Sequence, residues 1–177
     1  MAHYAVTAVG RDRPGIVAAL TRELLALDAN LADSQMSIMR GHFAVMLVAD
    51  LPETASPAQL AAGLDRVRDE LSLDTVQASR LDPAASERPE PSHVLSVYGA
   101  DHPGIVHSVS TVLARLGVNV TGLETRLVGS EESPLYAMIL ELELGGASES
   151  ELRAGLGEAA GDGGLEVSLR ELDAEAL

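Results

Sequence analysis

Apolar residues recur along the first half of the chain with two different periods, one typical of strands and one typical of helices. From Pro14 to Asp28 they stand at positions 16, 17, 20, 24 and 27, a spacing that places them on one face of a helix. The run before it, Tyr4–Val9, is short, largely apolar and closed by Gly10, as expected of a strand. The pattern therefore predicts a strand and then a helix. Pro14 suits the first helical turn, where its missing N–H is not needed.

The next segments predict a hairpin, a second helix and a final strand. Two strand-like runs flank the turn Arg40-Gly41-His42, and Ser56 before Pro57 is a typical helix start. Apolar residues at positions 60, 64, 67 and 71 then share one helical face. After the first helix, the predicted elements are Leu31–Met39, Phe43–Leu51, a helix beginning at Pro57, and Leu73–Arg80.

The second half of the chain repeats the first at an offset of 89 positions. The sequence Asp-x-Pro-Gly-Ile-Val occurs at positions 12–17 and again at 101–106, and Asn30 is matched by Asn119. An insertion of four residues in the region Gly129–Pro134 then shifts the match and predicts a longer hairpin loop. The repeat predicts a duplicated module. The elements of its second copy are predicted at His93–Tyr98, Pro103–Leu116, Asn119–Val128, Leu135–Leu144, Ser148–Ala160 and Leu165–Glu171.

The order strand, helix, strand, strand, helix, strand predicts the α+β, ferredoxin-like fold. Each copy would be a βαββαβ domain, a four-stranded antiparallel sheet with two helices on one face. Residues 1–81 form the first predicted domain and residues 93–177 the second. Between them, residues 82–92 contain three prolines beside Ser and Glu, which predicts a stiff, solvated linker.

The net charge of the chain argues against two classes of function, nucleic-acid binding and membrane binding. The formal net charge is -15, and no cluster of arginines interrupts the acidic surface. Nucleic-acid binding depends on basic patches that neutralise phosphates, and an anionic membrane would also repel this chain. No apolar run reaches the roughly 20 residues of a membrane span, and the N-terminus does not read as a signal peptide. A cytoplasmic protein without direct nucleic-acid or membrane contact is expected.

Catalytic chemistry finds little support in the residue types. The chain has no Cys, and its 12 basic residues are all Arg, so thiol nucleophiles, Schiff-base lysines and phosphate loops of the Walker type are excluded. The five histidines lack the spacing of metal ligands, and no serine sits in a nucleophile elbow. We expect a protein that is not an enzyme and that binds neither a metal nor a cofactor.

The repeated motif resembles a known family. Gly10-Arg11-Asp12-Arg13-Pro14-Gly15-Ile16-Val17 with Asn30-Leu31, and the second copy from Gly99 to Val106 with Asn119-Val120, resemble the signature of ACT domains. Two such modules with little else resemble the glycine cleavage system transcriptional repressor-like proteins. The resemblance covers nearly the whole chain, and the doubled motif is more specific for the domain than for that role.

The resemblance implies a regulatory protein that binds a small molecule, typically an amino acid, where modules pair. A regulatory partner protein is also expected, with transcriptional regulation acting through that partner. Apolar strands with few charges, such as Phe43–Val48, favour a homo-oligomer, although the two modules could instead pair within one chain. The ligand segments map onto the loop before each first helix and the start of each second strand. The implied ligand-binding residues are Asp12, Arg13, Pro14, Gly15, Ile16, Val17, Asn30 and Leu31 in the first copy, and Asp101, His102, Pro103, Gly104, Ile105, Val106, Asn119 and Val120 in the second.

These residue types suit an amino acid, although a structural interpretation stays open. A helix N-terminus offers free N–H groups to a carboxylate, and glycine allows close approach of the backbone. Asn30 carries a donor and an acceptor, and Asp12 can take an ammonium group. Alternatively, Asp12 caps its own helix, Gly15 serves packing and Asn30 is a turn residue. The competing function is an interaction module that docks a partner without any ligand. Because Arg13 is replaced by His102, the two loops need not bind the same ligand.

Overall fold

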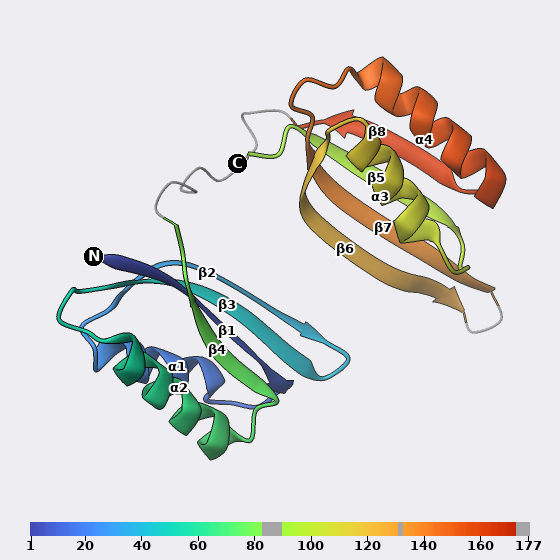
Figure 1. Ribbon diagram of the computed structural model, residues 1–177. Coiled ribbons are helices and arrows are strands. Elements are labelled where there is room, and N and C mark those ends of the chain that lie inside the picture. The colour runs from blue at the N-terminus through green and yellow to red at the C-terminus, as the bar shows by residue number, and fades with distance from the viewer. Residues whose placement is uncertain (83–89, 131–132, 173–177) are drawn as a thin grey trace. The chain divides into compact units, whose positions relative to one another are not determined.

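The order strand, helix, strand, strand, helix, strand occurs twice in the computed structural model, which describes residues 1–82, 90–130 and 133–172 (Figure 1). The chain divides into two compact units, Met1–Ser86 and Glu87–Leu177. Unit 1 contains β1 (Ala2–Arg11), α1 (Ile16–Leu25), β2 (Asn30–Met39), β3 (His42–Leu51), α2 (Pro57–Leu71) and β4 (Thr75–Arg80). Unit 2 contains β5 (His93–Ala100), α3 (Ile105–Arg115), β6 (Asn119–Ser130), β7 (Ser133–Glu143), α4 (Glu149–Gly163) and β8 (Glu166–Glu171). Most of the predicted linker, residues 83–89, lies outside the described residues.

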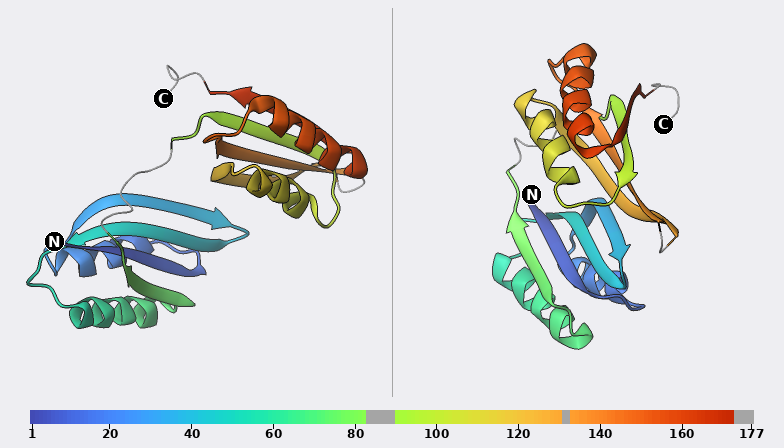
Figure 2. Two further views of the ribbon diagram at one scale, coloured as in Figure 1. Left: turned by 45° about the horizontal axis from the view of Figure 1, so that its top comes forward. Right: turned by 90° about the vertical axis from the view of Figure 1, so that its right-hand side faces the viewer.

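Each unit is one sheet with both helices on the same face (Figures 1 and 2). The strand order is β2-β3-β1-β4 in unit 1 and β6-β7-β5-β8 in unit 2. All neighbouring strands are antiparallel. This confirms the predicted ferredoxin-like fold, and within each unit it leaves one face of the sheet without a covering helix.

Alternation along the strands decides which side chains form each core. In β1 and β3, Val6, Val45 and Leu47 are buried against the helices, and the residues between them point to the open face. Leu20 of α1 closes the same core. Unit 2 repeats the arrangement with the buried set Leu95, Val97, Val109, Leu113, Met138, Leu140 and Leu152. Burial of apolar area in these two cores is the main stabilising term of each unit.

The helices begin in two different ways. Ser56 and Ser148 cap α2 and α4, and each forms a capping box with the residue three positions on, which confirms the helix start predicted at Ser56. By contrast, α1 and α3 begin at Ile16 and Ile105, two residues after Pro14 and Pro103. The prediction that proline occupies the first turn is therefore wrong. The glycines adopt φ of 98° and 99°, so the chain turns at glycine before the helix can start.

The outer strand of each sheet is largely exposed. Every residue of β2 is exposed, and its hairpin to β3 closes through Arg40 and Gly41, both with positive φ. In unit 2 the pairing of β6 with β7 continues to Gly129 with Pro134 and to Ser130 with Ser133. The insertion therefore lengthens two strands, where a longer loop was predicted; residues 131–132 lie outside the described residues. No helix in the described part of the chain is long and apolar enough to cross a membrane.

Candidate functional site

The loop between β1 and α1 leads the chain to an open helix N-terminus. Gly15 is the N-cap of α1, and its carbonyl oxygen accepts from the N–H of Ala19 at 2.9 Å. The three N–H groups before Ala19 have no acceptor within the helix, and no side chain among the described residues caps it by a hydrogen bond. The suggestion that Asp12 caps its own helix is therefore wrong. Gly104 makes the same start for α3, with the N–H of Ser108 at 2.9 Å.

The predicted loop residues are mostly on the surface. Asp12, Arg13, Pro14 and Gly15 are exposed, and the same holds for the equivalent residues 101–104 of unit 2. Ile16 and Ile105 are only 2% exposed and belong to the cores, and Val106 is half-buried against the core of unit 2. The two isoleucine side chains fix the start of each helix against the sheet, so only their backbone N–H groups face the loop.

The second predicted segment lies at the other end of the sheet from the loop. Arg11, the last residue of β1, pairs with His42, whereas Asn30 pairs with Asp50, which in turn pairs with His3 near the start of β1. The ten residues of α1 separate the two ends by about 15 Å. In unit 2, Asn119 pairs with Glu143 and is likewise far from the loop. Within one unit, the two predicted segments therefore do not come together.

The loop of unit 1 is joined to the hairpin of β2 and β3, and this corner is rich in arginine. The N–H of Asp12 donates to the carbonyl oxygen of Gly41 at 3.0 Å. Arg11, Arg13 and Arg40 therefore gather around it. Among the described residues, none of these three arginines takes part in an ion pair. No local sequence pattern predicts this cluster, because Arg40 is contributed by a turn distant in sequence.

Unit 2 presents different chemistry at its loop. Ala100 replaces Arg11, and His102 replaces Arg13. The Nδ1 atom of His102 lies 3.1 Å from the carbonyl oxygen of Pro103, in its own loop. The two loops therefore share a backbone path and differ in charge.

A shallow hollow lies beside the start of β2. It encloses about 480 Å³ and is lined mainly by apolar side chains, among them Leu24, Leu25 and Leu31. Leu25 is 72% exposed and Leu31 42% exposed. Leu31, a predicted ligand residue, thus lies on an open apolar surface and not in an enclosed pocket.

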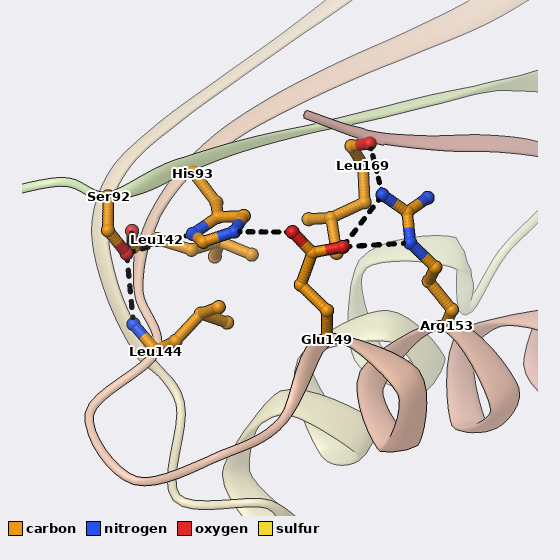
Figure 3. Close-up of polar contacts among 7 residues, drawn as sticks. All are labelled: Ser92, His93, Leu142, Leu144, Glu149, Arg153 and Leu169. Atoms are coloured by element: carbon orange, nitrogen blue, oxygen red, sulfur yellow. Dashed lines mark hydrogen bonds and ion pairs between the residues drawn. The ribbon is translucent and has the colours of Figure 1, made fainter. Parts of the chain in front are cut away.

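A partly buried polar network in unit 2 joins serine, histidine and glutamate (Figure 3). His93 Nδ1 lies 2.9 Å from Ser92 Oγ, and His93 Nε2 lies 3.0 Å from Glu149 Oε1. The hydroxyl of Ser92 also donates to the carbonyl oxygen of Leu142 at 3.3 Å. Arg153 donates to Glu149 at 3.0 Å and to the carbonyl oxygen of Leu169 at 2.9 Å. These contacts fasten α4 to three strands, and the engaged serine is a structural cross-link.

The hydrogen bond from His93 and, next, that from Arg153 lower the pKa of the Glu149 carboxyl. In unit 1, hydrogen bonds from Arg66 and Arg22 likewise lower the pKa of Glu23, which is buried between α1 and α2. Neither group faces a predicted ligand loop. No cluster of three or more His, Cys, Asp or Glu side chains within residues 1–82, 90–130 and 133–172 has the arrangement to hold a metal ion.

Comparison with known proteins identifies the family. ACT domain models match residues 3–77 and residues 93–148. A UPF0237 protein of Methanopyrus kandleri is 35% identical over 77 residues, which are 43% of this chain and 86% of that protein. A UPF0237 protein of Listeria innocua is 33% identical over 67 residues, 38% of this chain and 68% of that protein. The chain belongs to the ACT domain family and carries two ACT domains in tandem.

Two solved structures share the fold over the whole chain. An unknown protein from Galdieria sulphuraria has a TM-score of 0.78 at 24% identity and matches 97% of this chain and 99% of that one. A candidate glycine cleavage system transcriptional repressor has a TM-score of 0.73 at 18% identity and matches 97% of this chain and 98% of that one. At sequence identities of 24% and 18%, the structural similarity supports the fold alone. ACT domains are regulatory, and no catalytic family is indicated.

Proposed function

We propose that this protein is a non-enzymatic regulator that binds an amino acid where two of its modules pair. The observation that carries the proposal is the pair of open helix N-termini, reached through exposed loops and left without a side-chain cap. Free N–H groups at a helix start, together with the positive end of the helix dipole, suit a carboxylate. Asp12 or Asp101 would accept the ammonium group of the same ligand.

Pairing of modules explains why the second ligand segment is distant from the loop. Within one unit, Asn30 and the loop lie at opposite ends of β2. If the exposed edge strands of two modules pair in antiparallel fashion, the start of one strand lies beside the end of the other. Asn30 or Asn119 of one module would then reach the loop of its neighbour. A ligand at such a junction would stabilise the paired state, which is how binding would be transmitted to a partner protein.

The two loops would differ in preference. Arg11, Arg13 and Arg40 favour a ligand with an additional negative group at the loop of unit 1, because exposed unpaired arginines attract anions. Ala100 and His102 offer no such charge at the loop of unit 2. We therefore propose that the two loops bind different amino acids, or bind the same one with different affinity.

The pathway is a further part of the proposal. The similar structure described as a candidate glycine cleavage repressor makes glycine the first ligand, and glycine cleavage the first process, to test. Any effect on transcription would pass through a partner protein, because the net charge of -15 opposes direct contact with DNA.

An alternative function is a module that binds a partner protein without a ligand. The apolar surface beside β2 favours it, because Leu25, Leu31, Met36 and Ile38 are between 42% and 72% exposed. Partner capture that is unchanged by every amino acid would support this alternative.

A thermal-shift screen tests the ligand proposal. We expect at least one of the twenty common amino acids, present at about 100 times its Kd, to stabilise the protein by about 2.7 kcal/mol through mass action. Arg13→Ala and Asn30→Ala should reduce the shift for a ligand of the unit 1 loop. Arg80→Ala, an exposed arginine on the opposite edge strand, should leave it unchanged. Absence of any shift with all twenty amino acids would contradict the proposal.

A further inference from the structure

The open face of the unit 1 sheet has an uncharged centre, which is unusual for so acidic a chain. Because alternate residues point away from the helices, this face carries residues 5, 7 and 9 of β1 and residues 44, 46 and 48 of β3. They are Ala5, Thr7, Val9, Ala44, Met46 and Val48. Val9 is 41% exposed and Met46 is 47% exposed.

The two ends of this face carry opposite charge. Arg11 and His42 are paired across β1 and β3 at one end. Asp50 lies at the other end, where its Oδ1 atom is 2.6 Å from Nδ1 of His3, and Asp33 is paired with Val48 one row further in. Five rows of residues therefore run from a basic end through a neutral middle to an acidic end. Their central row contains Thr7 and Met46.

The matching face of unit 2 is different. Its central rows contain the charged residues Glu124, Arg126 and Glu166. In the next row, Val94 of β5 pairs with Glu141 on one side and with Arg170 on the other. Two copies of that face would bring carboxylates of like charge together in a dry interface, which is unfavourable. Of the two open sheet faces, the face of unit 1 is therefore the one whose uncharged centre suits contact with a copy of itself.

We infer that the open sheet face of unit 1 is the docking surface for a second copy of this chain, stacked with its strands antiparallel to those of the first. A two-fold axis that lies between the sheets, perpendicular to the strands, reverses the order of the rows. Met46 then meets its own counterpart, and the row of Arg11 and His42 of one copy faces the row of His3 and Asp50 of the other. The parallel alternative would stack the row of Arg11 and His42 on its own copy, and the row of His3 and Asp50 on its own copy. This inference goes beyond the proposed ligand binding and does not depend on it.

The area is sufficient for a specific contact. Four strands spaced about 4.8 Å apart and about nine residues long give a face of about 19 Å by about 30 Å. That is about 600 Å² for each copy and about 1,200 Å² in the dimer, within the range of specific interfaces. Stacked sheets pack about 10 Å apart, a distance that small side chains with interleaved Met and Val can fill.

A matched pair of substitutions tests the surface. Met46→Asp places two carboxylates at the centre of the interface and should weaken the dimer about 100-fold or more in sedimentation velocity, because neither charge can be solvated. Ile139→Asp changes the equivalent residue of unit 2, which is 41% exposed, and should leave the dimer intact. Both positions are exposed on open faces, and far-ultraviolet circular dichroism checks that each variant stays folded.

Two further variants test the alignment. Met46→Cys should form a disulfide between two copies on oxidation, since the chain has no other cysteine, and Ile139→Cys should not. Arg11→Asp and Asp50→Arg should each weaken the dimer, and their combination should restore it. A monomeric wild-type protein would overturn the inference, as would a dimer that Met46→Asp leaves intact. A wild-type monomer that Met46→Asp destabilises would instead indicate that another part of the same chain covers this face. Loss of amino-acid binding in the ligand screen would leave all these outcomes unaffected.

Discussion

Glu149 occupies the first position of α4, where its carboxylate accepts from His93 and from Arg153 (Figure 3). A carboxylate at a helix N-terminus also interacts favourably with the helix dipole. In unit 1 the equivalent residues are Tyr4 and Pro57, which line a common hollow and cannot form an ion pair. One copy of the module thus has a titratable contact where the other has an apolar one.

This contact predicts a difference in acid stability. The pKa of Glu149 is lowered in the folded state, chiefly by the hydrogen bond from His93, from an ordinary value of 4.5. A lowered folded pKa contributes stability that is present above the unfolded pKa and is lost as pH falls through the folded pKa. Glu149→Gln should therefore lower the melting temperature at neutral pH, and the gap to wild type should close as pH falls below 4.5. Glu158→Gln, an exposed change in the same helix, is the control; a gap that is constant with pH would contradict the prediction.

Two features at the level of single residues cannot be predicted from the sequence. The pattern Pro14-Gly15 suggests proline in a first helical turn, and only the backbone shows that Gly15 turns the chain in the left-handed region before the helix. The contact of His93 with Glu149 joins residues 56 positions apart, so no local sequence pattern predicts it. The repeat does not predict it either, because the first copy has no equivalent ion pair. The loop residues themselves follow from the motif, because the motif encodes the turn that exposes them.

The two helices of each unit cross at a glycine. Gly63 and Gly155 each follow a buried leucine by three positions, and a Cβ atom at either would enter the neighbouring helix. In unit 1 that atom would lie 3.0 Å from Oε2 of Glu23, and in unit 2 it would lie 2.9 Å from Cγ1 of Val112. The same crossing is thus filled by an ion-paired glutamate in one unit and by an aliphatic side chain in the other.

Two glycines of α4 should respond to alanine in opposite ways. Gly155→Ala places a methyl group against the stiff side chain of Val112, and overpacking should exceed the gain in helix propensity, for a net loss of about 1 kcal/mol. Outside its own helical turn, no atom of the described residues lies within 4 Å of the Cβ position of Gly157, so Gly157→Ala should gain about 0.5 to 1 kcal/mol. Chemical denaturation of the two variants measures both. Stabilisation by Gly155→Ala would show that α3 and α4 move apart at little cost.

The order of elements is predictable, since alternating and helical periods do not overlap in this chain. The ends of the strands are harder to predict than their order. Backbone hydrogen bonding extends β1 from Ala2 to Arg11, beyond the apolar run Tyr4–Val9. The insertion in the second hairpin shows the same effect, since paired backbone groups lengthen both strands. A ladder of backbone hydrogen bonds has no side-chain signature, and the exposed strand β2 has little apolar alternation to mark its register.

The whole molecule is one fold used twice, with a separate hydrophobic cluster in each unit. Duplication keeps the residues that specify the fold and allows the surfaces to differ. The cores match at equivalent positions, whereas the charges around the loops and on the open sheet faces do not. Shared structure is therefore predictable from the repeat, and the functional difference between the units must be read from the residues that the repeat does not preserve.

Separate cores predict separate responses to core damage in the intact chain. Leu47 of β3 and Leu140 of β7 are equivalent and almost fully buried, at 2% and 1% exposure. Leu47→Ala and Leu140→Ala should each cost about 2 to 5 kcal/mol, since each leaves a cavity in a close-packed core. Hydrogen exchange followed by mass spectrometry should show faster exchange only in peptides of the altered unit. The reciprocal variant is the control for each, because it changes the same residue type in the same fold position. Faster exchange in both units from either substitution would mean that the two ACT domains unfold as one cooperative body.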